Sequence, residues 1–175
     1  MASNFLYSTR EQKFILKEWL DLSKVFGAGR FQGGYSVDDI DSILENAMKI
    51  AKLSIAPTSD DGDNLHAVYK DGKVTTPESY KKGYWAIQEN GLGSSNADHT
   101  DPSSMPLCVM GGTNEYLAAA NASLGPYAMA TTGSAGLIRD FGSENIKNIF
   151  LPKMFSGQWS GTMDLHAIVG QQYEP

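Results

Sequence analysis

The chain has 175 residues, of which 41% are hydrophobic and 19% are charged, and its net charge is −6. This length favours one domain with a substantial core, and the composition is that of a globular protein. The negative charge and the scattered lysines and arginines argue against a nucleic-acid-binding surface. The single cysteine, Cys108, excludes an intramolecular disulfide and a multi-cysteine metal site, and its apolar neighbours predict a small buried side chain.

Neither a membrane span nor a secretory signal is predicted. No apolar run reaches the roughly 18 residues of a membrane helix. Residues 1–12 contain no long apolar segment of the kind found in signal peptides. We therefore expect a cytoplasmic protein that makes no contact with a membrane.

Two amphipathic helices are predicted in the first third of the chain. A capping box at residues 9–12 opens the first helix, and Gly27 and Gly29 end it. Ser36 caps the second helix, and Pro57 ends it. Side chains at helical spacing predict the buried faces, namely Ile15, Trp19, Leu22 and Phe26 in the first helix and Ile40, Ile43, Leu44, Ala47, Ala51 and Ile55 in the second.

An acidic segment and a hairpin follow. Asp60, Asp61 and Asp63 lie in the polar stretch 58–64, which we interpret as a solvated loop. A calcium loop of the EF-hand type is disfavoured, because the closing glutamate is missing and Asp71 stands in its place. Asp71-Gly72 between alternating residues predicts a β-hairpin over 68–74.

The second half of the chain reads as four further helices. Thr76-Pro77-Glu78 begins one helix and Asn90-Gly91 ends it, and a polar connection follows over 93–106. Helices are expected over 107–122 and 126–141, and a last one between Ser143 and Gly157. Residues 159–165 alternate like a strand, which needs a partner to be stable. The predicted fold is therefore mostly α: a helical bundle of about six helices with a small β-hairpin and a stray C-terminal strand.

Local patterns provide no catalytic or metal site. The three histidines, His66, His99 and His166, lack metal-ligand spacing. Ser134 lies in a segment, 132–136, that resembles a nucleophile elbow, but the first glycine and the preceding strand are absent. Packing of small residues in a helix is the favoured interpretation. The glycines at 27–34 follow no strand and do not predict a dinucleotide-binding turn.

Several motifs nevertheless resemble one enzyme family. The segments 114–121 (NEYLAAAN), 141–144 (FGSE), 151–153 (LPK) and 156–163 (SGQWSGTM), with Lys147 between them, are similar to the N-terminal helical domain of acyl-CoA dehydrogenases. The stretch 71–77 resembles the branch that includes the 3-methylmercaptopropionyl-CoA dehydrogenases. The resemblance implies a helical domain over 1–157 and the start of a middle β-domain over 158–175.

The resemblance also implies an activity and its participants. Acyl-CoA dehydrogenases use FAD and a glutamate base to remove two hydrogens from an acyl-CoA thioester, and their N-terminal domain mainly walls the acyl chain. By position, Met163 and Leu165 would lie at the cofactor. The residues implied for the wall are Tyr127, Met129, Ala130, Thr131, Thr132 and Gly133.

The last residues depart from the family pattern. After Met163 the family reads close to Cys-Leu-Thr-Glu-Pro and then Gly-Ser-Asp, whereas this chain has Asp164, Leu165 and His166. We therefore expect a truncated enzyme that lacks the catalytic base, binds no FAD by itself and is inactive alone. The alternative is a non-catalytic helical module for binding or self-association. The unpaired strand edge predicts a homo-oligomer.

Overall fold

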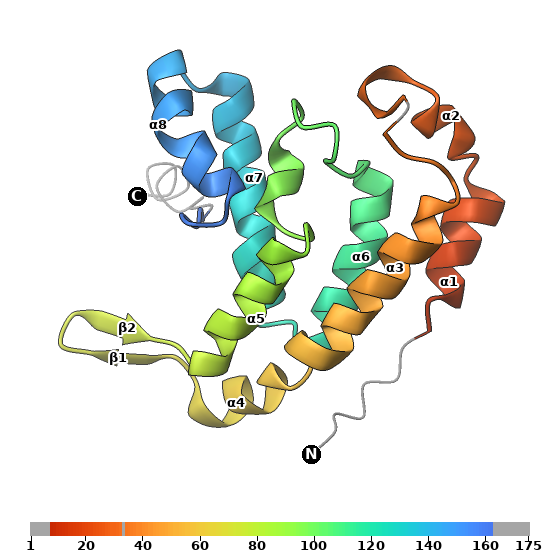
Figure 1. The fold of residues 1–175 in the computed structure, drawn as a ribbon. Coiled ribbons are helices and arrows are strands. Elements are labelled where there is room, and N and C mark those ends of the chain that lie inside the picture. Colours follow the sequence, from red (N-terminus) through yellow and green to blue (C-terminus); the bar gives the residue numbers. More distant parts are fainter. Residues whose placement is uncertain (1–7, 33, 163–175) are drawn as a thin grey trace, which may run out of the picture.

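The computed structural model describes residues 8–32 and 34–162, and this part of the chain is mostly α-helical, as predicted. In Figure 1, α3 and α6 lie beside a second group formed by α5, α7 and α8, and the hairpin projects at one end. The α-helices and strands are α1 (Arg10–Lys13), α2 (Ser23–Phe26), α3 (Asp39–Ile50), α4 (Thr58–Leu65), β1 (Val68–Lys70), β2 (Lys73–Thr75), α5 (Glu78–Glu89), α6 (Leu107–Ala120), α7 (Gly125–Phe141) and α8 (Glu144–Phe155).

The main core lies where α3 and its continuation, the π-helix η3 (Ala51–Ile55), pack on α6. Burial of apolar surface at this contact is the main stabilising contribution to the fold. Of the predicted buried face of the second helix, Ile40, Leu44, Ala47, Ala51 and Ile55 are completely buried, and Ile43 is partly buried. Val109 and Tyr116 of α6 are completely buried as well. A smaller cluster joins α7 and α8 through Ala135 and Met154.

The first predicted helix is interrupted rather than continuous. α1 passes into a π-helix, η1 (Phe14–Trp19), in which the Leu20 N–H donates to the Ile15 carbonyl at 2.9 Å. This wider turn shifts the register of the helix, so Leu16 is buried whereas Trp19 is 72% exposed. The prediction that Trp19 belongs to the buried face is wrong.

The Gln12 side chain is buried in the core and does not form the predicted capping box. Thr9 makes no side-chain cap, and Gln12 is buried. The Tyr116 hydroxyl donates to Gln12 Oε1 at 3.0 Å, and Gln12 Nε2 donates to Glu115 Oε2 at 2.7 Å. The hydrogen bonds therefore join the N-terminal helix to α6 across more than one hundred residues of sequence.

The start of α3 is fixed by an acidic side chain. The Ser36 backbone N–H and its hydroxyl both donate to Asp39 Oδ2 at 2.7 Å, and these bonds lower the pKa of the Asp39 carboxyl. The regular helix thus begins at Asp39, slightly later than the predicted cap at Ser36. Its end near Pro57 agrees with the prediction.

The segment that we expect to be a loop forms the helix α4. The Thr58 hydroxyl donates to the Ile55 carbonyl and accepts from Asn121 Nδ2, at 2.7 and 2.8 Å. Asp60 and Asp61 lie in the first turn, where negative charge favours the helix dipole. The loop prediction is therefore wrong, because a buried contact with a distant residue supports a helix that the local sequence does not predict.

The hairpin agrees with its prediction. β1 and β2 pair in antiparallel fashion, with Lys70 opposite Lys73. Asp71 and Gly72 have φ angles of 51° and 77°, which are the positive values required by a two-residue type I′ turn. All six strand residues are exposed, so the hairpin stands out from the helices.

The last helices and the corner after them position the candidate site. Ser143 caps α8 by accepting from the Ile146 N–H, and Gly157 has a φ of 74° where the chain turns. Beyond this corner, Trp159 contacts Phe150 with ring centroids 5.5 Å apart. Residues 159–162 form no strand, so the predicted strand over 159–165 is wrong for its described part, and its other residues lie outside the described range.

Candidate functional site

The six residues predicted to wall the acyl chain do not form one surface. They lie on α7, and successive residues of an α-helix are rotated by about 100°. Tyr127 and Thr131 consequently face one side, while Thr132 and Gly133 line a cavity on the opposite side. Met129 is exposed and Ala130 is half-buried, and neither lines one of these two cavities.

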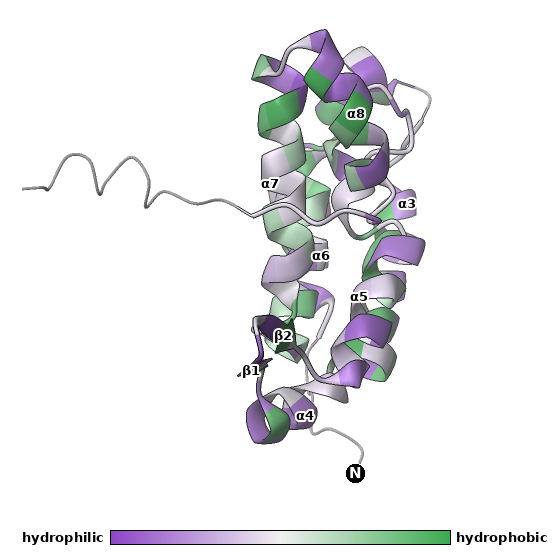
Figure 2. Cartoon of the chain, turned by 90° about the vertical axis from the view of Figure 1, so that its left-hand side faces the viewer, coloured by the Kyte–Doolittle hydropathy of each residue, from purple (hydrophilic) through white to green (hydrophobic). Residues whose placement is uncertain are grey.

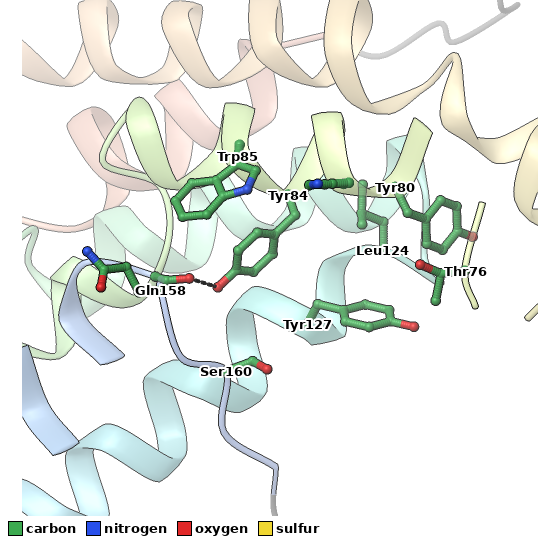
Figure 3. A pocket seen from close by; sticks show the side chains of 10 residues that line it. Thr76, Tyr80, Tyr84, Trp85, Leu124, Tyr127, Gln158 and Ser160 are labelled. Atoms are coloured by element: carbon green, nitrogen blue, oxygen red, sulfur yellow. Dashed lines mark hydrogen bonds between the residues drawn. The ribbon is translucent and has the colours of Figure 1, made fainter. Parts of the chain in front are cut away.

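Tyr127 closes an aromatic pocket together with three aromatic side chains of α5 (Figure 3). The pocket has a volume of about 220 Å³. The Tyr80 and Tyr127 rings meet edge to face, with centroids 6.3 Å apart. We call this space the aromatic pocket; its lining residues are Thr76, Tyr80, Lys81, Tyr84, Trp85, Leu124, Tyr127, Gly157, Gln158 and Ser160.

One side of the aromatic pocket is held by the corner after α8. The Tyr84 hydroxyl donates to the Gly157 carbonyl at 2.8 Å, the bond drawn in Figure 3. Burial raises the pKa of Tyr84, and a hydrogen bond with Gln88 opposes that rise. Tyr84 therefore keeps its proton at neutral pH and remains a donor. The lining combines aromatic faces with a few polar groups, which is the usual character of a small-molecule site.

The segment after the corner is seated on α7. The Gly161 N–H donates to Thr131 Oγ1 at 3.1 Å, and the Thr162 carbonyl lies 3.2 Å from Ser134 Oγ. A Cβ at Gly161 would lie 2.6 Å from the Ser134 Cβ, so only glycine permits this close approach. Thr131 is therefore completely buried and holds the chain itself, and its role in an acyl wall stays a prediction.

Ser134 has no nucleophile geometry. Its hydroxyl donates to the Ala130 carbonyl at 2.8 Å, the ordinary bond of a serine within a helix. The residues around it belong to α7 from Gly125 to Phe141 without interruption, and no strand leads into a strained turn. The structure therefore agrees with the interpretation of Ser134 as a packing residue.

A second cavity, on the opposite side of α7, contains two arginines. We call it the arginine cavity; it has a volume of about 370 Å³ and is lined by Arg30, Phe31, Asn96, Ala97, His99, Met105, Leu107, Met110, Thr132, Gly133, Gly136 and Arg139. The predicted polar connection 93–106 borders this cavity and contains a short helix. Its short helix η4 (Ser94–Ala97) is fixed because the Ser94 hydroxyl donates to the Met154 carbonyl at 2.7 Å, and Asn96 Oδ1 accepts from the Met105 N–H at 2.9 Å.

The charges around the arginine cavity are unevenly paired. Arg139 binds the Asp140 carboxylate and the Ala97 carbonyl, whereas Nη1 of Arg30 is buried and has no hydrogen-bond partner among the described residues. Burial lowers the pKa of His99, and the nearby charges of Arg139 and Arg30 lower it further. His99 is therefore neutral at pH 7.

The described residues contain no group of three His, Cys, Asp or Glu side chains placed to hold a metal ion. No helix within residues 8–32 and 34–162 is both long and apolar enough to cross a membrane. Cys108 is half-buried at the margin of the main core, so it is less enclosed than predicted.

FAD binding is not supported by the groups near the end of the described chain. The predicted cofactor positions, Met163 and Leu165, lie outside the described residues. A flavin dinucleotide carries a pyrophosphate, which proteins bind with available basic groups or helix N-termini. Lys153 Nζ lies 4.1 Å from the centre of the Trp159 ring, and Lys147 is paired with Glu144 at 2.9 Å. Neither of these two lysines is therefore a free basic group for the pyrophosphate.

Sequence reasoning missed most of both cavities. The spacing of Tyr80 and Tyr84 predicts one helix face, but it does not distinguish a core face from a pocket wall. Arg30, His99 and Arg139 are separated by 40 residues or more and share no motif. Only the density of aromatic residues at 80, 84 and 85 offered a signal for the aromatic pocket.

No family model matches the chain. A butyryl-CoA dehydrogenase of Syntrophomonas wolfei is 34% identical over 165 residues, which cover 93% of this chain and 27% of that protein. A second protein of the same name and organism is 31% identical over 166 residues. The 3-methylmercaptopropionyl-CoA dehydrogenase of Ruegeria pomeroyi is 32% identical over 131 residues, which cover 74% of this chain and 22% of that protein.

The chain therefore spans about a quarter of the length of the curated relatives that it matches. All three relatives bear the name of an acyl-CoA dehydrogenase, and two of them match 93% of the chain. This similarity agrees with the motifs at 114–121 and 141–163. By homology over nearly its whole length, the chain belongs to the acyl-CoA dehydrogenase family.

Proposed function

We propose that this chain forms one wall of the acyl-binding site of a cytoplasmic, FAD-dependent acyl-CoA dehydrogenase. In this proposal residues 1–157 are a helical domain, residues from 158 onward begin a β-domain, and residues outside this chain supply the flavin site and the base. The reaction would be α,β-dehydrogenation of an acyl-CoA thioester.

The observation that carries the proposal is the aromatic pocket under Tyr127. An acyl chain is apolar and flexible, and a concave site with aromatic walls removes it from water. Thr76, Gln158 and Ser160 add polar groups at the same pocket. Tyr127 is also the member of the predicted wall that faces this space, so the resemblance and the geometry agree at one residue.

The direct test is a calorimetric titration of the chain with butyryl-CoA and, separately, with CoA. Butyryl-CoA adds three CHₙ groups that the aromatic pocket can bury, each worth about 0.8 kcal/mol. We therefore expect butyryl-CoA to bind more tightly than CoA by about 2 kcal/mol, or roughly 30-fold. Equal affinities would show that the acyl chain is not bound.

The chain alone is expected neither to retain FAD nor to oxidise acyl-CoA. Glu144 is paired with Lys147, and Glu115 accepts a hydrogen bond from Gln12, so neither is placed as a base. Without positioned proton and hydride acceptors, roughly 7–11 kcal/mol of barrier reduction from orientation is lost. The assay combines FAD, a panel of acyl-CoAs and an artificial electron acceptor. Turnover above a buffer blank, or yellow protein after gel filtration, would contradict this expectation.

Self-association is a second candidate function. Figure 2 shows hydrophobic residues on α7 and α8, and several of them have exposed side chains, which favours association. They are Leu137, Phe141, Ile146, Ile149 and Phe150, with Phe141 82% exposed. This surface replaces the strand edge as the reason to expect a homo-oligomer.

Light scattering over a concentration series should therefore give a mass above that of a monomer. Phe141→Asp should weaken the association at least tenfold, because it places a charge on this apolar surface. Tyr69→Asp is the matched control, since Tyr69 is 73% exposed but lies on the hairpin. A monomer at every concentration, or an equal effect of the two substitutions, would exclude this surface.

A further inference from the structure

The arginine cavity combines positive charge with an apolar lining. Arg30 comes from the short helix η2 (Gly29–Phe31), and its guanidinium carbon lies 4.4 Å from the centre of the Phe31 ring. Arg139 comes from α7, more than one hundred residues later. Met105, Leu107 and Met110 provide thioether and aliphatic groups at the same cavity. These elements place a cationic group and an apolar surface around one open space.

The two guanidinium groups differ in whether a carboxylate balances their charge. The charge of Arg139 is balanced by Asp140, whose carboxylate it holds at 2.7 to 2.8 Å. Arg30 has no such partner among the described residues, and its Nη1 is buried without a hydrogen bond. A buried donor on a permanent cation is costly unless an acceptor satisfies it. The acceptor that best fits a guanidinium is a carboxylate or phosphate oxygen.

We propose that the arginine cavity binds a small organic anion, namely a carboxylate with a short apolar chain. The carboxylate pairs with the Arg30 guanidinium, and the chain lies against Met105 and Met110. The lining selects an organic carboxylate over inorganic phosphate, because phosphate would leave the apolar groups uncovered. A cavity of about 370 Å³ also exceeds what a single small inorganic ion would fill.

Glycines make room for such a ligand. A Cβ added at Gly136 would meet only Arg139 Nη2, at 3.8 Å, so a larger side chain there would extend into the cavity without striking the backbone. Thr132 and Gly133 border the same space. This site is separate from the aromatic pocket, which lies on the other side of α7.

His99 provides a spectroscopic reporter of binding. The groups that act on its imidazole are Arg139 and Arg30, which disfavour the charged form, and Asp140 and Asp98, which favour it. An anion bound at Arg30 adds negative charge nearby, so the pKa of His99 should rise when the cavity is occupied. His66 lines a different pocket, so its NMR signals should not move when the arginine cavity is occupied.

The experiment titrates the chain with hexanoate, hexanol and inorganic phosphate, and it follows the histidine signals by NMR and the affinity by calorimetry. Hexanoate should bind at least tenfold more tightly than hexanol or phosphate and should raise the pKa of His99. Arg30→Gln should weaken hexanoate binding at least tenfold. Arg10→Gln is the matched control, because Arg10 also lies over a ring, that of Phe14, but is paired with Glu18 and does not line the cavity.

A second pair of variants keeps both arginines. Gly136→Leu should block hexanoate by filling the cavity, whereas Gly111→Leu, where an added Cβ meets nothing within 4 Å, should leave binding unchanged. Circular dichroism verifies that each variant is folded. Equal binding of hexanoate and hexanol, equal binding of phosphate, or undiminished binding by Arg30→Gln would overturn the proposal. None of these outcomes depends on acyl-CoA binding or turnover.

Discussion

Replacing Leu44 by alanine is expected to lower the free energy of unfolding by about 2–5 kcal/mol. Leu44 is completely buried on α3, where it packs in the contact with α6. The substitution removes buried methyl groups and leaves a cavity that the surrounding helices fill only in part. Leu53→Ala provides the control, because Leu53 is 68% exposed, and it should change the free energy of unfolding by less than about 0.5 kcal/mol.

The measurement is urea denaturation of both variants and of the unchanged chain, followed by circular dichroism. The transition midpoint of Leu44→Ala should fall sharply while the slope of the transition stays the same. Similar midpoints for the two variants would mean that the contact of α3 with α6 is not the centre of the fold.

The second large effect is expected from adding volume where α5 approaches its neighbours. A Cβ at Gly83 would lie 2.5 Å from Leu124 Cδ2 and 3.4 Å from Thr58 Cγ2. Leu124 is itself buried and cannot move aside freely. Gly83→Val should therefore destabilise the chain by about 3 kcal/mol, as is typical of overpacked cores.

Gly111→Val is the matched control for this prediction. Gly111 is exposed on α6, and an added Cβ there meets nothing within 4 Å. Because glycine is a poor helix former, this substitution should be neutral or stabilising by up to about 0.5 kcal/mol. If thermal unfolding shows Gly83→Val to be as stable as Gly111→Val, the close approach of α5 is incorrect.

Periodicity predicts the helices of the second half because their signals are local. Gly91 and Gly157 adopt the positive φ angles expected at helix ends, and Ser143 makes the predicted cap. The hairpin is equally local, since Asp71-Gly72 determines its turn. These elements need no information from distant parts of the chain.

The predictions that failed concern features that depend on contacts between residues far apart in the sequence or on a change of helix type. α4 forms because Thr58 bonds to Asn121, which is 63 residues away, and no local pattern encodes that contact. η1 turns Trp19 outward through a change of register that a strict 3.6-residue period does not anticipate. The polar role of Gln12 likewise depends on Tyr116.

Only part of the candidate site could be predicted from the sequence, for the same reason. A run of residues such as 127–133 wraps completely around a helix, so it cannot line a single wall. Tyr127 faces the aromatic pocket, whereas Thr131 holds Gly161 and Gly133 borders the arginine cavity. Which residue faces which space depends on the packing of α5 and of the corner at Gly157.

The central claim, that the aromatic pocket receives an acyl chain, is tested most directly by two substitutions on α7. Tyr127→Ala removes a ring from the pocket, while Met129→Ala removes an equally exposed apolar side chain that does not line it. The measured quantity is the ratio of the affinity for butyryl-CoA to that for CoA. Tyr127→Ala should reduce this ratio at least fivefold, because the ring supplies about 1 kcal/mol or more of contact with the chain. Met129→Ala should leave the ratio unchanged. A ratio that is insensitive to Tyr127→Ala, or equally sensitive to both substitutions, would contradict the assignment of this pocket.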